Sequence, residues 1–209
     1  MTTGDSWSDA TRVEGWAGEI RVNLVRLLAI VIFYARHLIE YFMSAPDAPI
    51  RGRYHLAVTI LIVAWAFEAG LLHLWLSRRR YEAGIKYAAA LWDAIMITAL
   101  CAVAKDPRSP LVMIYFAFIA TTPLRLSLKL IYFATAAAML GYLVLLAYYA
   151  WYVIGFQKYY ATPEVRVPRS HEVIVLLSML VCGLLAGQVV RQARRIASGH
   201  LAVTVTQES

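Results

Sequence analysis

A few ionisable side chains lie inside long apolar stretches of this sequence, and these are the residues that could do chemistry. In the segment Tyr34-Ala-Arg-His-Leu-Ile-Glu40, Arg36 and Glu40 are four residues apart, and His37 precedes Glu40 by three. On a helix, residues at these spacings share a face and can contact each other. Two interpretations stay open: a self-neutralising ion pair, and a polar pocket that binds a ligand headgroup or relays protons.

Histidines also open two other apolar stretches, at His55 and at His171. If these two ends lie on the same side of a membrane as His37, the three imidazoles could converge. Two facing histidines can hold a haem iron, and three can hold zinc or copper. The favoured interpretation is that histidines at helix ends form hydrogen bonds at the membrane interface, so the spacing leaves the metal unassigned and haem b a weaker hypothesis.

Two carboxylates, Glu68 and Asp93, lie within neighbouring apolar stretches that a short basic loop connects. Helices joined by so short a loop form an antiparallel pair, so we expect both carboxylates in the half of the membrane nearest that loop. Lys86 and Arg125 are candidate cationic partners for Asp93. Structural hydrogen bonds between helices are the favoured interpretation. A proton-coupled site is the alternative, because a charge inside a membrane needs a partner or a function.

The elements that position these residues are apolar segments of membrane-spanning length. Hydrophobic residues make up 61% of the 209 residues and charged residues only 16%, whereas soluble proteins are about half apolar and a quarter charged. At roughly 20 apolar residues for each span, the sequence predicts six spans. The segments are continuously apolar rather than alternating, which favours helices over barrel strands. The fold class is therefore an all-α polytopic membrane bundle.

Prolines and glycines mark the ends of the predicted helices, most clearly in a loop predicted at Ser44–Arg53. The last helix is expected to continue through the basic segment that ends at Arg195. The six predicted transmembrane helices cover about Val22–Met43, Tyr54–Leu76, Gly84–Ala104, Leu111–Leu124, Leu130–Phe156 and His171–Val190.

Basic residues give these helices a direction across the membrane. Of the 20 lysines and arginines, twelve fall on one side of the predicted spans, seven on the other, and Arg36 lies within a span. Because cytoplasmic loops carry the excess of positive charge, both chain ends are predicted to be cytoplasmic, in a bacterial inner membrane. The chain then divides into a cytoplasmic segment, 1–21, a six-helix transmembrane domain, 22–195, and a short cytoplasmic tail, 196–209.

The net charge of +7 predicts attraction to anionic lipid headgroups rather than to nucleic acid. Lipid or partner contacts are predicted for Arg78, Arg79, Arg80, Arg191, Arg194 and Arg195.

Catalytic motifs are missing from the sequence. It contains no Gly-x-Ser-x-Gly nucleophile turn, no His-Glu-x-x-His zinc motif and no phosphate-binding Walker loop. The two cysteines, Cys101 and Cys182, lie in apolar stretches and form no Cys-x-x-Cys pair, so we expect small buried hydrophobes. The sequence therefore predicts a protein that is not an enzyme.

The residues around the third predicted helix resemble a known family. Asp93, the outer turn Ser109-Pro-Leu111 and Tyr115 resemble the region of the quinone-responsive turn in redox-sensing histidine kinases. More widely, six short-looped helices that end in a basic segment resemble the membrane input domains of bacterial sensor kinases and cyclases. This resemblance implies a quinone as the ligand, bound on the outer side.

The sequence departs from that family's pattern at two places. Lys105 and Asp106 occupy the region of a Gly-Gly pair, and the family's Asn-Pro-Phe is Ser-Pro-Leu here. With the polar groups described above, the candidate ligand-binding residues on the outer side are Arg36, His37, Glu40, His55, Ser109, Pro110, Tyr115 and His171.

The favoured function is a sensory or regulatory membrane module that binds a quinone or another small ligand. It would signal through the last helix to a cytoplasmic partner, and it could act as a homodimer. A sensor kinase would continue past Arg195 into an output domain, so the output is expected on a separate polypeptide. The alternatives are an accessory subunit of a respiratory or photosynthetic electron-transfer complex that binds haem or quinone, and a transporter.

Overall fold

The computed structural model describes the backbone of residues 3–43, 49–78, 84–104, 109–155 and 168–207. It describes side chains over the narrower ranges 16–43, 52–78, 84–104, 109–155 and 168–196. Within these ranges the secondary structure is helical, without strands. The all-α fold class is thus confirmed.

Six α-helices make up most of the part of the chain that the structure describes. Their bounds are α1 Thr3–Met43, α2 Pro49–Ser77, α3 Ile85–Val103, α4 Met113–Thr121, α5 Leu128–Tyr148 and α7 Arg169–Gln207. Three short helices extend α4 and α5: the 3-10 turns η1 (Pro110–Val112) and η2 (Thr122–Arg125) flank α4, and a π-helical turn, η3 (Tyr149–Val153), continues α5.

Five of these helices are long and apolar enough to cross a membrane, which makes the chain a multi-pass membrane protein. The five segments are Trp16–Met43, Gly52–Ser77, Ile85–Val103, Leu128–Val153 and Arg169–Ile196. The predicted fourth span corresponds to a shorter apolar helix, Pro110–Arg125. Its length, about 24 Å at 1.5 Å per residue, is below the usual ~30 Å of the hydrocarbon core.

Several helix ends differ from the sequence prediction. Helix α1 begins at Thr3 rather than near Val22. Helix α2 begins at Pro49, inside the loop predicted at Ser44–Arg53, because proline is well tolerated in the first turn of a helix, where its missing N–H has no helical partner. Helix α7 continues to Gln207, past the predicted end of the transmembrane domain.

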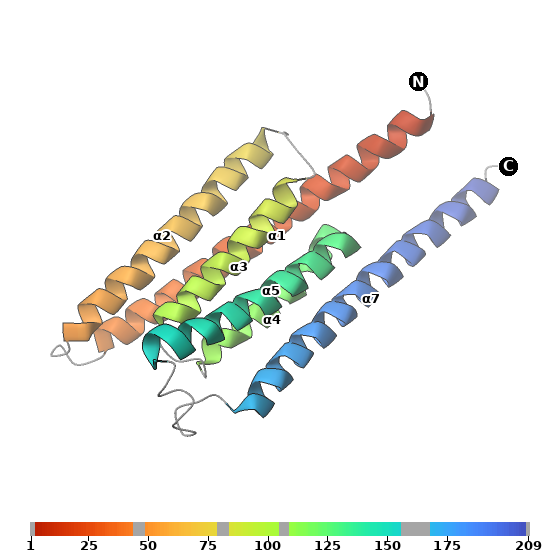
Figure 1. Ribbon diagram of the computed structural model, residues 1–209. Helices are drawn as coiled ribbons and strands as arrows, with labels where there is room; N and C mark the ends of the chain where they lie inside the picture. Colours follow the sequence, from red (N-terminus) through yellow and green to blue (C-terminus); the bar gives the residue numbers. More distant parts are fainter. Residues whose placement is uncertain (1–2, 44–48, 79–83, 105–108, 156–167, 208–209) are drawn as a thin grey trace.

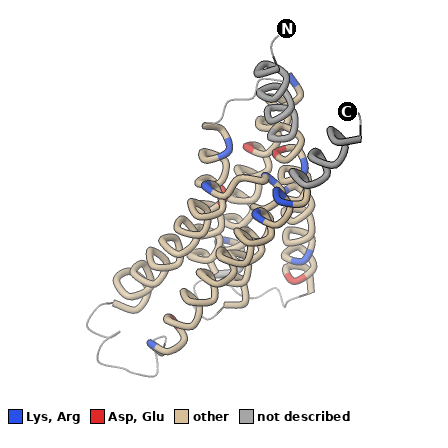
Figure 2. Tube along the Cα trace, turned by 90° about the vertical axis from the view of Figure 1, so that its right-hand side faces the viewer, with Lys and Arg blue, Asp and Glu red and all other residues tan. Residues whose placement is uncertain are grey.

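The helices run side by side along one axis (Figure 1). Helices α1, α2 and α3 pack together, α5 packs against α3, and α7 lies against α4 and α5. Both chain ends lie at the same end of the bundle, beyond the other helices (Figure 1). We call this the inner end. Lysines and arginines gather towards it (Figure 2).

Small residues let the helices approach closely. A Cβ atom added to Gly141 on α5 would lie 3.2 Å from the Tyr115 ring on α4, and one added to Gly183 on α7 would lie 2.7 Å from Cγ2 of Thr135 on α5. The first contact is tighter than most real Cβ contacts and the second is shorter than real Cβ atoms show, so a larger residue at either position would require the neighbouring side chain or helix to move. Close packing through small residues is how membrane helices associate without a hydrophobic driving force.

Candidate functional site

Helix α1 turns one face of its inner half into the bundle, and that face is polar. Trp16, Glu19, Asn23 and Arg26 follow one another at spacings of three, four and three residues, which places them along a single stripe. Glu19, Asn23 and Arg26 are buried, with 1%, 0% and 6% of each residue exposed. The stripe continues with Ile30, which is also buried, so the polar face belongs to the main packing seam of α1.

Arg26 is the centre of a buried ionic group shared by α1, α2 and α3. Its Nη2 atom lies 2.6 Å from Oδ2 of Asp93 on α3, and its Nη1 atom lies 3.2 Å from Oε2 of Glu68 on α2. Trp65 Nε1 donates a hydrogen bond of 2.9 Å to the other oxygen of Asp93. Asn23 accepts from Arg26 at 3.2 Å and donates to the Ala69 carbonyl at 3.0 Å. One guanidinium therefore links three helices.

A second buried ion pair lies closer to the inner end. Arg125 Nη2 in η2 is 3.1 Å from Oε2 of Glu19 on α1, and both side chains are almost fully buried. Arg125 also donates to the backbone carbonyl of Lys86 at 3.2 Å. The prediction that Lys86 or Arg125 pairs with Asp93 is therefore wrong: Asp93 pairs with Arg26, Arg125 pairs with Glu19, and the Lys86 ammonium lies 5.4 Å from the Tyr87 ring centroid.

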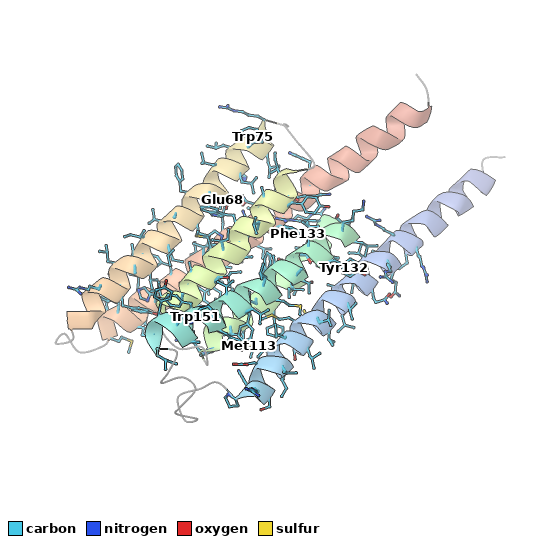
Figure 3. The ribbon with its side chains drawn as sticks, viewed as in Figure 1. Glu68, Trp75, Met113, Tyr132, Phe133 and Trp151 are labelled. Carbon is cyan, nitrogen blue, oxygen red and sulfur yellow. The ribbon has the colours of Figure 1, made fainter. Side chains whose placement is uncertain are left out.

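We name the five charged residues of these two groups the ionic cluster. They are Glu19, Arg26, Glu68, Asp93 and Arg125. Glu68 lies on α2, on the half of the bundle nearer the inner end (Figure 3). Sequence reasoning singled out Glu68 and Asp93 and named Arg125 as a candidate partner of Asp93, but it assigned no role at the site to Glu19 and Arg26. The regular spacing of polar residues on α1 is the signal that could have revealed Glu19 and Arg26.

The turn between α4 and α5 connects this cluster to α7. We name residues 122–127 the inner turn. Leu126 has a positive φ of 48°, which is unusual for a bulky residue. Its amide donates to the Pro123 carbonyl at 2.9 Å, and its carbonyl accepts a hydrogen bond from Arg194 of α7. On the other side, a Cβ atom on Gly18 of α1 would lie 2.8 Å from the Leu124 carbonyl oxygen. The inner turn therefore contacts both α1 and α7.

A second polar group lies at the opposite end of α1 and α2. His37 Nε2 and His55 Nδ1 are 3.1 Å apart, and the Tyr41 ring stacks on His55 with centroids 4.0 Å apart. The Tyr54 ring meets His37 edge-on. Two histidines on opposite sides of a haem iron need ligating nitrogens about 4 Å apart, because each metal–nitrogen bond is about 2 Å long. The pair is a direct hydrogen bond in this arrangement.

His171 does not join the other two histidines, because its helix packs elsewhere in the bundle. It is exposed near the start of α7, a helix that packs against α4 and α5 rather than α1 and α2. Within the ranges that the structure describes, no three histidine, cysteine or acidic side chains come together as a metal site. Arg36 and Glu40 form an ion pair of 3.4 Å with both side chains mostly exposed.

The residues of the outer turn use their polar atoms within the chain. The Ser109 hydroxyl accepts a hydrogen bond of 3.3 Å from the Leu111 amide, and Pro110 begins η1. Tyr115 is fully buried, and its hydroxyl lies 2.7 Å from that of Thr98.

The basic residues predicted to contact lipid or a partner have different surroundings. Arg191 donates a hydrogen bond of 2.5 Å to the hydroxyl of Tyr132, which lies between α5 and α7 (Figure 3). Arg194 reaches Leu126, as described above, while Arg78 and Arg195 are exposed. Arg79 and Arg80 lie outside the described residues.

This fold and site define a class of protein: a multi-pass helical bundle with buried ion pairs near one end. No family model, no curated protein and no solved structure matches the chain. Any function must therefore be argued from the site itself.

Proposed function

We propose that this chain is an integral membrane sensory or regulatory module whose output element is α7. The observation that carries the proposal is the inner turn. It is tied to α1 by the Glu19–Arg125 ion pair and to α7 by the Arg194–Leu126 hydrogen bond. A change in the ionic cluster therefore has a short physical route to α7.

The mechanism would be a shift between two arrangements of the inner turn. A left-handed conformation at a bulky residue such as Leu126 (φ 48°) costs about 1–2 kcal/mol, so it persists only while contacts from both sides hold it. Loss of the contact to α1 would favour a relaxed turn and release α7. A stimulus can drive such a shift only if it interacts differently with the two arrangements.

The proposed module has six membrane crossings and both chain ends in the cytoplasm. The helix Pro110–Arg125 would also cross the membrane and bring the number of crossings from five to six. An even number of crossings agrees with both chain ends lying at one end of the bundle. The excess of basic residues at that end supports a cytoplasmic location in a bacterial inner membrane. Signalling would then pass to a cytoplasmic partner through α7 beyond the membrane.

A quinone remains the ligand that the sequence resemblance favours. An apolar groove of about 380 Å³ runs between α3 and α5, and Thr98, the partner of Tyr115, is among its lining residues. A hydrophobic ligand could enter it from the bilayer. A haem-binding subunit has less support, since His37 and His55 bond directly to each other.

Distances between spin labels would test the output role of α7. In a chain with Cys101→Ala and Cys182→Ala, labels are placed on cysteines at Ser77 of α2 and Ile196 of α7, both exposed near the inner end. Arg194→Gln removes the bond to Leu126 without leaving a buried charge. We expect the distance distribution to move by about 1–2 Å or to broaden, the scale of helix shifts in known switches.

Glu40→Gln is the matched control, because it removes an exposed ion pair at the other end of the bundle and should leave the distribution unchanged. An unchanged distribution in folded Arg194→Gln and Glu19→Gln proteins would refute the relay. Adding a short-chain quinone to the same labelled protein tests the ligand: no movement would remove the quinone but leave the relay in place.

A further inference from the structure

The ionic cluster does not balance its charges. It contains three carboxylates and two guanidinium groups, which leaves one negative charge in excess when all are ionised. The nearby Lys86 ammonium lies over the Tyr87 ring, forms no ion pair within the described part of the chain, and acts on Glu19 only at longer range. An uncompensated charge inside a membrane costs several kcal/mol, and a bound proton on one carboxylate would remove it.

Geometry distinguishes the three carboxylates. Asp93 accepts two short bonds, 2.6 Å from Arg26 and 2.9 Å from Trp65, which favour its ionised form. Glu19 is 99% buried against the guanidinium of Arg125, at 3.1 Å. Removing either negative charge would leave a buried guanidinium without its closest counter-ion.

Glu68 differs from both in contact and in access. Its oxygens lie 3.2 and 3.5 Å from a single nitrogen of Arg26, whose other nitrogen already holds Asp93. The side chain of Glu68 is 23% exposed, against 7% for Asp93 and 1% for Glu19. Glu68 is thus the carboxylate that can lose its charge at least cost and that a proton can reach.

The charged groups around Glu68 come from three elements. Arg26 faces it from α1, Asp93 from α3 and, at longer range, Arg125 from η2. Glu68 lies nine residues before the end of α2 and Asp93 eight residues after the start of α3, about 12–14 Å from the inner end of each helix. Glu68, Asp93 and the Arg26 guanidinium that contacts both therefore share one depth in the inner half of the bundle.

We infer that Glu68 is a reversible proton-binding site. A proton from the inner side adds to the Glu68 carboxylate and gives the neutral acid, and the Arg26–Glu68 ion pair is replaced by a weaker neutral contact. Arg26 keeps Asp93, so α1 and α3 stay joined while α2 is held less tightly. The role of this protonation as a stimulus for α7 rests on the proposed function, but proton binding by Glu68 does not.

Infrared spectroscopy of the full chain in liposomes tests this site directly. A protonated carboxylic acid has a C=O stretching band apart from that of a carboxylate. We expect such a band to appear and disappear reversibly with pH, to shift when the protein carries ¹³C-carboxyl glutamate, and to vanish in Glu68→Gln. Glu40→Gln, which changes an exposed carboxylate outside the cluster, should retain the band.

A second variant protects the test against misfolding. Glu68→Asp keeps a carboxyl group at this position, so its band should shift with ¹³C-aspartate instead of ¹³C-glutamate. A reversible band that persists in Glu68→Gln, or no protonated glutamate while the protein stays folded, would overturn the inference. The spin-label distances distinguish the two proposals: a proton site without movement of α7 would reject only its role as a stimulus.

Discussion

Arg26 is the residue on which the ionic cluster most depends, because two carboxylates share its guanidinium. In Arg26→Met, Asp93 loses its counter-ion while it stays buried. Removing one partner of a buried ion pair typically costs about 3–5 kcal/mol. We expect a loss of that size in the free energy of unfolding, measured by denaturant titration in detergent micelles.

A double variant separates the loss of the pair from the burial of a lone charge. Arg26→Met combined with Asp93→Asn should recover much of the stability, because no unpaired charge remains at Asp93. Arg36→Met is the control: its ion pair with Glu40 is mostly exposed and should contribute less than about 1 kcal/mol. Equal losses in Arg26→Met and Arg36→Met would mean that the cluster does not stabilise the fold.

Part of this cluster can be predicted from the sequence. The depth of Glu68 and Asp93 follows from the lengths of their apolar segments and the short loop between them. Their partner Arg26 cannot be predicted in the same way, because an arginine near a helix end fits a role in membrane topology equally well. Only the direction in which α1 faces its neighbours shows that Arg26 points into the bundle, and that direction depends on packing.

The histidines illustrate the same limit. His37 and His55 meet because α1 and α2 form an antiparallel hairpin, as sequence neighbours usually do. His171 opens a helix at the same end of the bundle, but α7 packs on α4 and α5. The order in which helices pack around a bundle depends on side-chain fit, and the spacing of histidines does not predict it.

At the scale of the elements, glycine sets how closely α7 approaches α5. A Cβ atom at Gly183 would overlap the Thr135 side chain, with Cγ2 at 2.7 Å. Gly183→Ala should therefore force α7 away from α5 and cost about 1–3 kcal/mol, as overpacking usually does. The measurement is again the free energy of unfolding in detergent.

The chain offers a matched control on another helix. A Cβ atom at Gly70 of α2 would meet nothing within 4 Å, so Gly70→Ala should be neutral or stabilising by up to about 1 kcal/mol, because alanine favours helix. If Gly183→Ala is also neutral or stabilising, the close contact between α5 and α7 does not exist in the folded protein.

Helix boundaries show which part of an element the sequence can predict. Apolar segments locate the membrane-spanning part of each helix because lipid selects for it. Helix α1 nevertheless begins at Thr3 and α7 continues to Gln207, since a helix does not need to end where its apolar stretch ends. The π-helical turn Tyr149–Val153 has no such signal, because it depends on a shifted backbone hydrogen bond.

At the scale of the whole molecule, charge and shape agree on one direction. The ionic cluster, the inner turn and most of the basic residues that the structure describes lie towards the end that holds both termini, while the His37–His55 pair lies at the other end. Positive charge stays in the cytoplasm during membrane insertion. The end that carries the proposed relay should therefore be cytoplasmic, where a partner protein could contact α7.

Thiol labelling in intact bacteria would determine this orientation. In the chain with Cys101→Ala and Cys182→Ala, single cysteines are introduced at Ser77, Ile196 or His171, all exposed in the structure. A membrane-impermeant reagent should label the cysteine at His171 in intact spheroplasts, and those at Ser77 and Ile196 only after permeabilisation. The reverse pattern would invert the protein in the membrane. Labelling of Ser77 and Ile196 from opposite sides would mean that Pro110–Arg125 does not cross, and the relay from the ionic cluster to α7 would lose its shared cytoplasmic end.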